Sequence, residues 1–286
     1  MHPTLIRIGN LDIRFYGICI ALAFLLGLAV AKRHAREKGI PQPAVENFAF
    51  VAMISGVIGA RLYYVAFHLP WYLANPLEIP AVWHGGLAIH GGIICGFFGA
   101  FLYSRIKKIP FLAFGDLMAA PFILGQAVGR IGNFMNGEVH GVPVVTPWSV
   151  IFRLKPAFGD WYARYLTLPA AERLQYAPKV PWGLVFPPSS PAGSEFPGVA
   201  LHPAMLYESV LNLAGFCLIW FVLRKKCGKK PGRLWWWYLI LYSVNRIIVS
   251  FFRVEDLMIG PFRAPHAVSA LIMVFAALML ARGKEA

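Results

Sequence analysis

Residues 15–31 read FYGICIALAFLLGLAVA, seventeen consecutive residues without a charged side chain. A helix needs about 20 mainly apolar residues to cross the roughly 30 Å hydrocarbon core of a bilayer, and this run is close to that length. The rest of the chain is similar, because 58% of its 286 residues are hydrophobic and only 14% are charged. Soluble domains carry about 25% charged residues. The composition therefore excludes a water-soluble globule and predicts a membrane protein.

Six further stretches are apolar enough to be expected as membrane helices. A β-barrel would instead show segments of about ten residues that alternate in polarity. We predict an all-α membrane protein that forms a single polytopic domain over residues 1–286. Its seven transmembrane helices are expected at about residues 15–33, 48–69, 87–104, 114–134, 203–224, 234–253 and 265–282.

Basic residues predict the orientation of these helices. The segments that follow the first, third, fifth and seventh stretch hold 15 of the 27 Lys and Arg residues, whereas residues 70–86 hold none. Cytoplasmic loops are the ones enriched in Lys and Arg. The N-terminus is therefore expected on the periplasmic side and the C-terminus in the cytoplasm. The formal charge of +14 is then mostly topological, and no nucleic-acid partner is expected.

One periplasmic connection, residues 137–202, is long and rich in Pro and Trp. It contains two similar strings, PWSVIF at 147–152 and PWGLVF at 181–186. They predict either short strands of a small periplasmic loop subdomain, or segments that lie on the membrane. The four cysteines have no metal-ligand spacing, and no nucleotide or zinc motif is present, so neither a metal nor a cofactor is expected.

Polar residues concentrate at the outer end of the fourth stretch, where residues 129–141 read GRIGNFMNGEVHG. On a continuing helix Arg130, Asn133 and Asn136 share one face, because they are spaced by three residues. Charged groups at membrane depth cost several kcal/mol unless they are paired or hydrated, so they mark functional sites. The alternative is a polar helix end capped by Asn and Gly, which does not require Arg, Glu and His together.

A second polar cluster surrounds His90, which follows Gly85-Gly86 and precedes Gly91-Gly92 at the start of the third stretch. An imidazole titrates near neutral pH and is a natural proton acceptor. The commoner role of such a histidine is a hydrogen-bonded packing residue. Both interpretations stay open on these residues alone.

Four arginines lie in or near the predicted membrane helices: Arg61, Arg130, Arg246 and Arg253. Few carboxylates are available to pair with them, Glu255 among those few. A guanidinium suits bidentate phosphate binding, so an anionic ligand such as a phospholipid headgroup explains the excess. Snorkelling to the interface is the alternative for Arg61 and Arg253.

The motifs resemble those of the prolipoprotein diacylglyceryl transferase family. The similarity rests first on the long string from Gly129 to Gly141, and it extends in order over nearly the whole chain. Its other parts are Arg14-Phe15-Tyr16-Gly17, Gly85-Gly86 with His90-Gly91-Gly92, and His202-Pro203 with Leu206-Tyr207-Glu208.

The resemblance implies an enzyme of the bacterial inner (cytoplasmic) membrane. It transfers the diacylglyceryl group of phosphatidylglycerol to the thiol of the lipobox cysteine in a preprolipoprotein signal peptide, and it releases glycerol phosphate. Its expected partners are these two substrates and the bilayer, and a monomer is expected. By position, the resemblance implies catalytic roles for His90, Arg130, Arg246 and Tyr16. It implies phosphatidylglycerol binding by Arg130, Asn133, Asn136, Glu138, Gly141, Arg246, Tyr207 and Glu208.

Some positions depart from the family pattern near the proposed site. Ser250 stands where the family usually has Glu, Ala204-Met205 replace a small polar residue and Gln, and Pro265-His266 replace an expected Gln. Arg246 is then expected to pair with Glu138 or Glu208 instead of a local carboxylate. A divergent paralogue with low activity, a transporter or flippase for an anionic solute or lipid, and a non-catalytic scaffold are the competing hypotheses.

Overall fold

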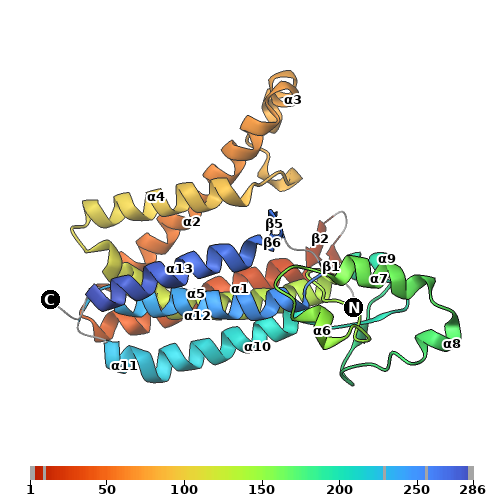
Figure 1. Ribbon diagram of the computed structural model, residues 1–286. Coiled ribbons are helices and arrows are strands. Elements are labelled where there is room, and N and C mark those ends of the chain that lie inside the picture. Colours follow the sequence, from red (N-terminus) through yellow and green to blue (C-terminus); the bar gives the residue numbers. More distant parts are fainter. Residues whose placement is uncertain (1–3, 9–10, 228–229, 255–256, 283–286) are drawn as a thin grey trace. The chain divides into compact units, whose positions relative to one another are not determined.

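The computed structural model describes residues 4–8, 11–227, 230–254 and 257–282, so Glu255 lies outside the described residues. The chain divides into two compact units, one made of residues 1–27 with 119–286 and the other of residues 28–118. Two helices, α1 (Phe15–Glu37) and α5 (Phe111–Asn136), contribute to both units (Figure 1). Each unit is described by itself.

The larger unit is mainly a group of long helices. The helical run from Ala204 to Cys227 consists of α10 (Ala204–Cys217), the π-helical turn η3 (Leu218–Leu223) and α11 (Arg224–Cys227). It packs against α12 (Arg233–Phe252), which in turn packs against α13 (Ala264–Arg282) (Figure 1). Two hairpins accompany these helices, β1 (Thr4–Ile8) with β2 (Leu11–Arg14) and β5 (Met258–Ile259) with β6 (Phe262–Arg263).

Residues 137–202 belong to the larger unit and fold into short elements. These are α6 (Trp148–Ile151), α7 (Phe158–Thr167), α8 (Ala170–Arg173), β3 (Leu184–Val185), α9 (Pro191–Glu195) and β4 (Ala200–Leu201). Of the two similar strings, the second supplies β3, which pairs with β4, whereas the first forms the helical turn α6. The strand interpretation is therefore wrong for residues 147–152.

The smaller unit is organised by close packing of α2 (Gln42–Phe67) against α4 (Ile89–Ile106). A side chain at Gly91 would lie 2.3 Å from the carbonyl oxygen of Gly59, so glycine is required at this crossing. The short elements α3 (Leu69–Ala74), η1 (Pro76–Glu78) and η2 (Val82–His84) connect the two helices. Phe48 stacks on Phe114 with ring centroids 4.2 Å apart and centres the core of this unit.

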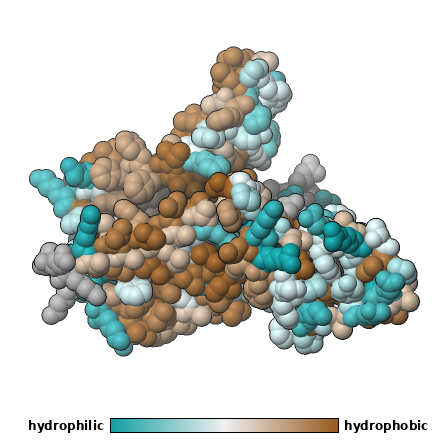
Figure 2. All heavy atoms as spheres, in the orientation of Figure 1, coloured by the Kyte–Doolittle hydropathy of each residue, from teal (hydrophilic) through white to brown (hydrophobic). Residues whose placement is uncertain are grey.

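Apolar side chains cover the outside of the long helices. Leu25 on α1, Phe98 on α4 and Leu271 on α13 are all more than half exposed. On the face shown in Figure 2, hydrophobic residues cover α10, α12 and α13, whereas hydrophilic residues gather around α7 and α8. Such surfaces belong in lipid rather than in water. The protein is an all-α, multi-pass membrane protein.

Six of the helices in the described part of the chain are long and apolar enough to cross a membrane. They correspond to six of the seven predicted stretches. The stretch at 234–253 forms the helix α12, but Asn245, Arg246 and several Trp and Tyr residues lower its hydropathy. Helix α2 begins six residues before its predicted start, at Gln42, because Pro43 lies in its first turn, where the missing N–H of proline costs no helical hydrogen bond.

Candidate functional site

The last turns of α5 carry the polar network that the spacing of its residues predicts. The helix continues to Asn136, so Arg130, Asn133 and Asn136 do share a face. Arg130 donates from Nη1 to Oδ1 of Asn133 at 3.0 Å, and from Nη2 to Oε1 of Glu208 at 2.7 Å. Glu208 is only 3% exposed, so this ion pair joins α5 to the first turns of α10 in a largely dry environment.

Glu138 closes the network from the turn that follows α5. Gly137 has a φ of +67° and Val139 a φ of +60°, so the chain reverses direction immediately after the helix. The Glu138 carboxylate accepts from Nδ2 of Asn133 at 3.1 Å and from Nδ2 of Asn136 at 3.4 Å. The two asparagines therefore connect the guanidinium of Arg130 to a second carboxylate.

Gly141 lies where this turn meets His202, the residue before α10. The amide of Gly141 donates to the His202 carbonyl at 2.9 Å, and the His202 amide donates to the Val142 carbonyl at 2.9 Å. A Cβ on Gly141 would lie 2.7 Å from the carbonyl oxygens of both His202 and Phe252. Glycine is required here because three backbone segments approach one point.

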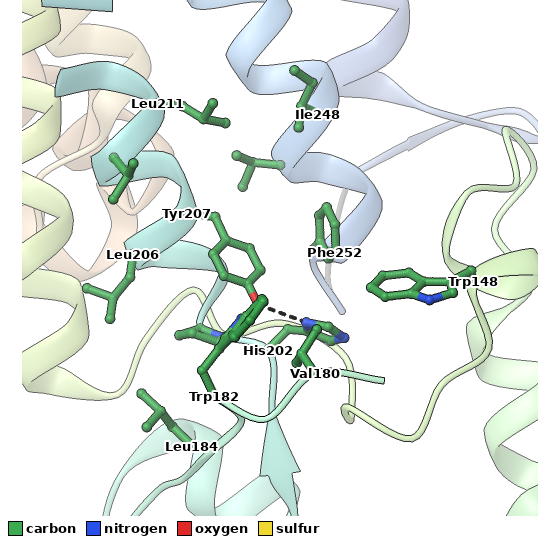
Figure 3. Close-up of a pocket in the computed structure, with 13 residues that line it drawn as sticks. Trp148, Val180, Trp182, Leu184, His202, Leu206, Tyr207, Leu211, Ile248 and Phe252 are labelled. Carbon is green, nitrogen blue, oxygen red and sulfur yellow. Dashed lines mark hydrogen bonds between the residues drawn. The ribbon is translucent and has the colours of Figure 1, made fainter. Parts of the chain in front are cut away.

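Tyr207 and His202 form a hydrogen-bond chain beside the network. Trp182 Nε1 donates to the Tyr207 hydroxyl at 2.8 Å, and this hydroxyl lies 3.0 Å from Nδ1 of His202. Burial of His202 without a charged partner lowers its pKa from 6.5 to about 4, so the imidazole is neutral at physiological pH. The three side chains line an apolar cavity of about 610 Å³, and Figure 3 shows their arrangement.

Tyr16 lies in the first turn of α1, which begins at Phe15. It packs against α5 at Gly132, where an added Cβ would lie 2.9 Å from Cδ2 of Tyr16. Its side chain is 39% exposed, so it is accessible to a ligand. Gly132 is two positions after Arg130 in the chain, which places Tyr16 near the part of α5 that carries the network.

Arg246 lies on α12 and lines a second cavity of about 760 Å³. Arg253 and Arg263 line the same cavity, so three guanidinium groups gather there. Ser250, which stands where the family usually has Glu, is buried, and its carbonyl accepts from Arg263 Nη1. The carboxylate of Glu208 pairs with Arg130 and that of Glu138 with the two asparagines, and the expected pairing of Arg246 with one of these carboxylates stays a prediction.

His90 belongs to the smaller unit, where it is the second residue of α4. Its side chain is exposed and its ring centroid lies 6.1 Å from that of Tyr63. The glycines around it have structural roles, since Gly85 and Gly86 have positive φ angles and Gly91 packs against Gly59. An exposed imidazole at the start of a helix can exchange protons with a ligand.

Arg61 has a role that the sequence did not reveal. Its guanidinium is buried, and its acceptors among the described residues are backbone carbonyls: Nε donates to Ile79 at 2.8 Å, and Nη1 donates to Gly85 at 2.6 Å and to Gly86 at 3.0 Å. Nη2 donates to the carbonyl of Glu78. Arg61 therefore holds the segment between α2 and α4, and neither the snorkelling nor the anionic-ligand interpretation describes it.

The structure thus brings six of the predicted residues into one place: Arg130, Asn133, Asn136, Glu138 and Glu208 directly, and Gly141 through the adjoining turn. In the sequence, His202 is part of the His202-Pro203 motif, and it was expected to close the site together with Tyr207 and Glu208. Its position immediately before Pro203, at the start of a membrane stretch, was the available signal. In the part of the chain that the structure describes, no three His, Cys, Asp or Glu residues are close enough to hold a metal ion.

An all-α membrane protein with an arginine–carboxylate–carboxamide network between the end of α5 and the start of α10 belongs to the class of integral membrane proteins in which such charged groups mark a functional site. The comparison with known families is more specific. The family model of the prolipoprotein diacylglyceryl transferases matches residues 3–282, and the chain belongs to this family.

Several relatives carry the name phosphatidylglycerol–prolipoprotein diacylglyceryl transferase. One from Fusobacterium nucleatum is 58% identical over 285 residues, which cover 100% of this chain and 99% of the relative. One from Synechococcus elongatus is 37% identical and covers 97% of this chain and 86% of its own. One from Thermotoga maritima is 35% identical, and the alignment covers 98% of this chain and 84% of the relative.

Proposed function

We propose that this protein transfers the diacylglyceryl group of phosphatidylglycerol to the thiol of a lipobox cysteine in a preprolipoprotein. Membership of the family supports the reaction. The observation that carries the proposal is the Arg130–Glu208 pair with its two asparagines, because it presents a fixed guanidinium at the end of a membrane helix. An anionic lipid headgroup is the ligand that reaches this position from the bilayer.

The reaction forms a carbon–sulfur bond and breaks the bond between the same glycerol carbon and the phosphate oxygen. The thiol loses its proton, and glycerol phosphate leaves with the electron pair of the broken bond. A thiol with a pKa of about 8.5 is a weak nucleophile at neutral pH, so a proton acceptor is needed. The departing phosphate gains negative charge, so positively charged donors are needed as well.

The residues have separate roles in this proposal. Arg130 binds the phosphate, and Arg246 neutralises the charge that develops on it. Asn133, Asn136, Glu138 and Glu208 hold Arg130 and contact the glycerol headgroup, while Gly141 and Tyr207 shape the adjoining wall. His90 accepts the thiol proton, and Tyr16 contacts the substrate from the first turn of α1. The chemistry requires no cofactor.

The proposed topology has seven transmembrane helices, with α12 as the sixth in chain order. The N-terminus is periplasmic, the C-terminus is cytoplasmic, and the membrane is the bacterial inner membrane. The basic segments after α1, α4, α11 and α13 support this orientation. A reporter that is active only in the cytoplasm, fused after residue 286, tests it. Activity of the fusion agrees with the proposal, and its absence in a membrane-inserted protein contradicts it.

The direct test of the function uses purified protein, phosphatidylglycerol vesicles and a peptide that contains a lipobox. A mass increase of one diacylglyceryl group on the cysteine is expected, together with release of glycerol phosphate. A peptide with serine in place of the cysteine is the control. Solute uptake into vesicles without this mass increase would support a transporter instead.

The same assay tests His90 with the variant His90→Gln. General acid–base groups typically contribute about 10²–10⁴-fold to rate, so thioether formation is expected to fall by at least a hundredfold. His84→Gln is the matched control, because His84 is also exposed in this unit but pairs with Glu78. Near-normal transfer by His90→Gln would remove His90 from the mechanism and leave it as a packing residue.

A further inference from the structure

The outer ends of α10 and α12 are separated by an apolar groove, which is the cavity of about 610 Å³ described above. Deeper along the same two helices, Nδ2 of Asn245 donates to Oδ1 of Asn212 at 3.1 Å, and both residues are buried. This pair joins the helices at that level. Within one helical turn of this pair, Leu211, Val210 and Ile248 line the open groove.

The groove opens toward the lipid side of the protein. Val210 is 67% exposed and Ile248 is 40% exposed, and α10 belongs to a helical run that is long and apolar enough to cross a membrane. Trp148 and Trp182 line the outer end, and tryptophan is enriched at the level of the lipid headgroups. The groove therefore runs from the interface level down along the hydrocarbon.

One polar group inside the groove has no hydrogen-bond partner in the part of the chain that the structure describes. This group is Nε2 of His202, and His202 is fully buried. The Tyr207 hydroxyl accepts from Trp182, and we assign its own proton to a hydrogen bond to Nδ1 of His202, which corresponds to the tautomer with the imidazole proton on Nε2. Figure 3 shows this edge of the ring on the side opposite the hydrogen bond to Tyr207, toward Trp148.

The groove thus offers a long apolar wall and a single buried donor, with no free acceptor among its lining side chains. A buried donor without a partner costs free energy, so a ligand that supplies an acceptor is favoured. A fatty-acyl ester matches, because it has a hydrocarbon chain and a carbonyl oxygen but no donor. A peptide segment fits less well, because its backbone N–H groups would stay unsatisfied.

Backbone hydrogen bonds also connect the groove to the polar network of Arg130, Glu138 and Glu208. His202 exchanges hydrogen bonds with Gly141 and Val142, which directly follow the turn that carries Glu138. We propose that the groove binds an acyl chain of the donor phospholipid, and that an ester carbonyl of this lipid accepts a hydrogen bond from Nε2 of His202. The proposal rests on the proposed function and assigns to it the site of the acyl ester.

The test compares phosphatidylglycerol with its diether analogue, which has the same chains and headgroup but no ester carbonyl. Both contain the bond that breaks, so both can act as donors. The wild type is expected to use the diester with a KM about three to ten times lower, which is the range for one hydrogen bond. His202→Leu is expected to raise the KM for the diester alone, so that the two lipids become equivalent donors. His202→Gln keeps an amide donor and is expected to retain most of the preference for the diester.

Because His202 is buried, a second variant tests the groove without altering the core. Val210→Phe fills the groove from its exposed side and is expected to raise the KM for long-chain donors at least threefold more than for short-chain donors. Leu213→Phe is the matched control, since Leu213 is 50% exposed on the same helix but lies outside the groove. Leu213→Phe should leave the KM for long-chain donors and the KM for short-chain donors unchanged.

Other outcomes overturn the proposal. Equal use of diester and diether by the wild type, or an equal loss of both in His202→Leu, means that no ester is recognised here. A change in the KM for the peptide instead of the lipid means that the substrate peptide occupies the groove. If the wild type transfers from neither lipid, the proposed function fails. Lipid binding by the same variants, measured by native mass spectrometry, then decides whether the groove recognises the ester.

Discussion

Gly141→Ala is expected to disrupt the point where three backbone segments meet. These are the turn after α5 that carries Glu138, the residue His202, and the end of α12. The new Cβ would lie 2.7 Å from the carbonyl oxygens of His202 and Phe252, and an ordinary contact begins at 3.4 Å, so each must retreat by 0.7 Å. Both oxygens accept hydrogen bonds, from Gly141 at 2.9 Å and from Val142 at 2.8 Å. A retreat of this size lengthens these bonds to about 3.6 and 3.5 Å, beyond useful hydrogen-bond distances.

Two lost backbone hydrogen bonds cost about 1–3 kcal/mol, and overpacking adds about 1–3 kcal/mol. The sum is about 2–6 kcal/mol, which corresponds to a fall in Tm of at least about 4 °C. Differential scanning fluorimetry of the purified protein in detergent measures it, and transfer is expected to fall at least tenfold because Glu138 moves. Gly159→Ala is the control, since nothing lies within 4 Å of a Cβ there. An unchanged Tm and transfer rate in Gly141→Ala would refute the reasoning.

Three other predictions follow from single residues. In Arg61→Lys the single ammonium cannot reach the carbonyls of Glu78, Ile79 and Gly85 together. Amide hydrogen exchange in residues 78–86 should therefore accelerate at least tenfold, whereas the control Arg105→Lys leaves the exchange rate unchanged. Glu138→Gln deprives one asparagine of its acceptor, so the KM for phosphatidylglycerol should rise about three- to tenfold, and an unchanged KM would contradict the role of Glu138. The His202 pKa of about 4 lies below its unfolded value of 6.5, so unfolding takes up a proton at low pH. Stability is unaffected above pH 6.5 and falls by up to about 3 kcal/mol as the pH drops from 6.5 to 4, a loss that denaturation of His202→Gln should lack.

The long helices were predictable because a membrane span has a minimum length and must be apolar, and α1 and α13 meet both conditions. The short hairpin of β1 and β2 and the π-helical turn within the run from Ala204 to Cys227 were not. Neither has a distinct composition, because the hairpin strands are only five and four residues long and a π-helical turn differs from an α-helix only in the spacing of its backbone hydrogen bonds. The two similar PW strings show the same limit, because residues 147–152 and 181–186 have nearly the same letters and form different structures.

The candidate site was predictable to the extent that it is local. The three-residue spacing on α5 placed Arg130, Asn133 and Asn136 on one face, and the structure agrees. Glu138 reaches Asn133 and Asn136 because the chain reverses direction through two residues with positive φ angles. One of them is Val139, and no residue pattern indicates a positive φ there. Arg61 was misjudged because its partners are backbone carbonyls, and carbonyls are present at every position of a sequence.

The formal charges around Arg130 explain why the proposed reaction requires a second arginine. Arg130 contributes one positive charge and its network contains two carboxylates, Glu138 and Glu208, so the network has no positive charge to spare before the lipid binds. The phosphate diester adds one negative charge, and a second develops when the carbon–oxygen bond breaks. The demand for positive charge is therefore greatest in the transition state, and a group that supplies it there affects kcat more than KM.

Arg246, which lines a cavity with Arg253 and Arg263, is the residue assigned to this role. Arg246→Lys keeps the charge but not the planar fork of donors, so it should lower kcat more than it raises the KM for phosphatidylglycerol. An effect confined to KM would place Arg246 in binding of the ground state instead.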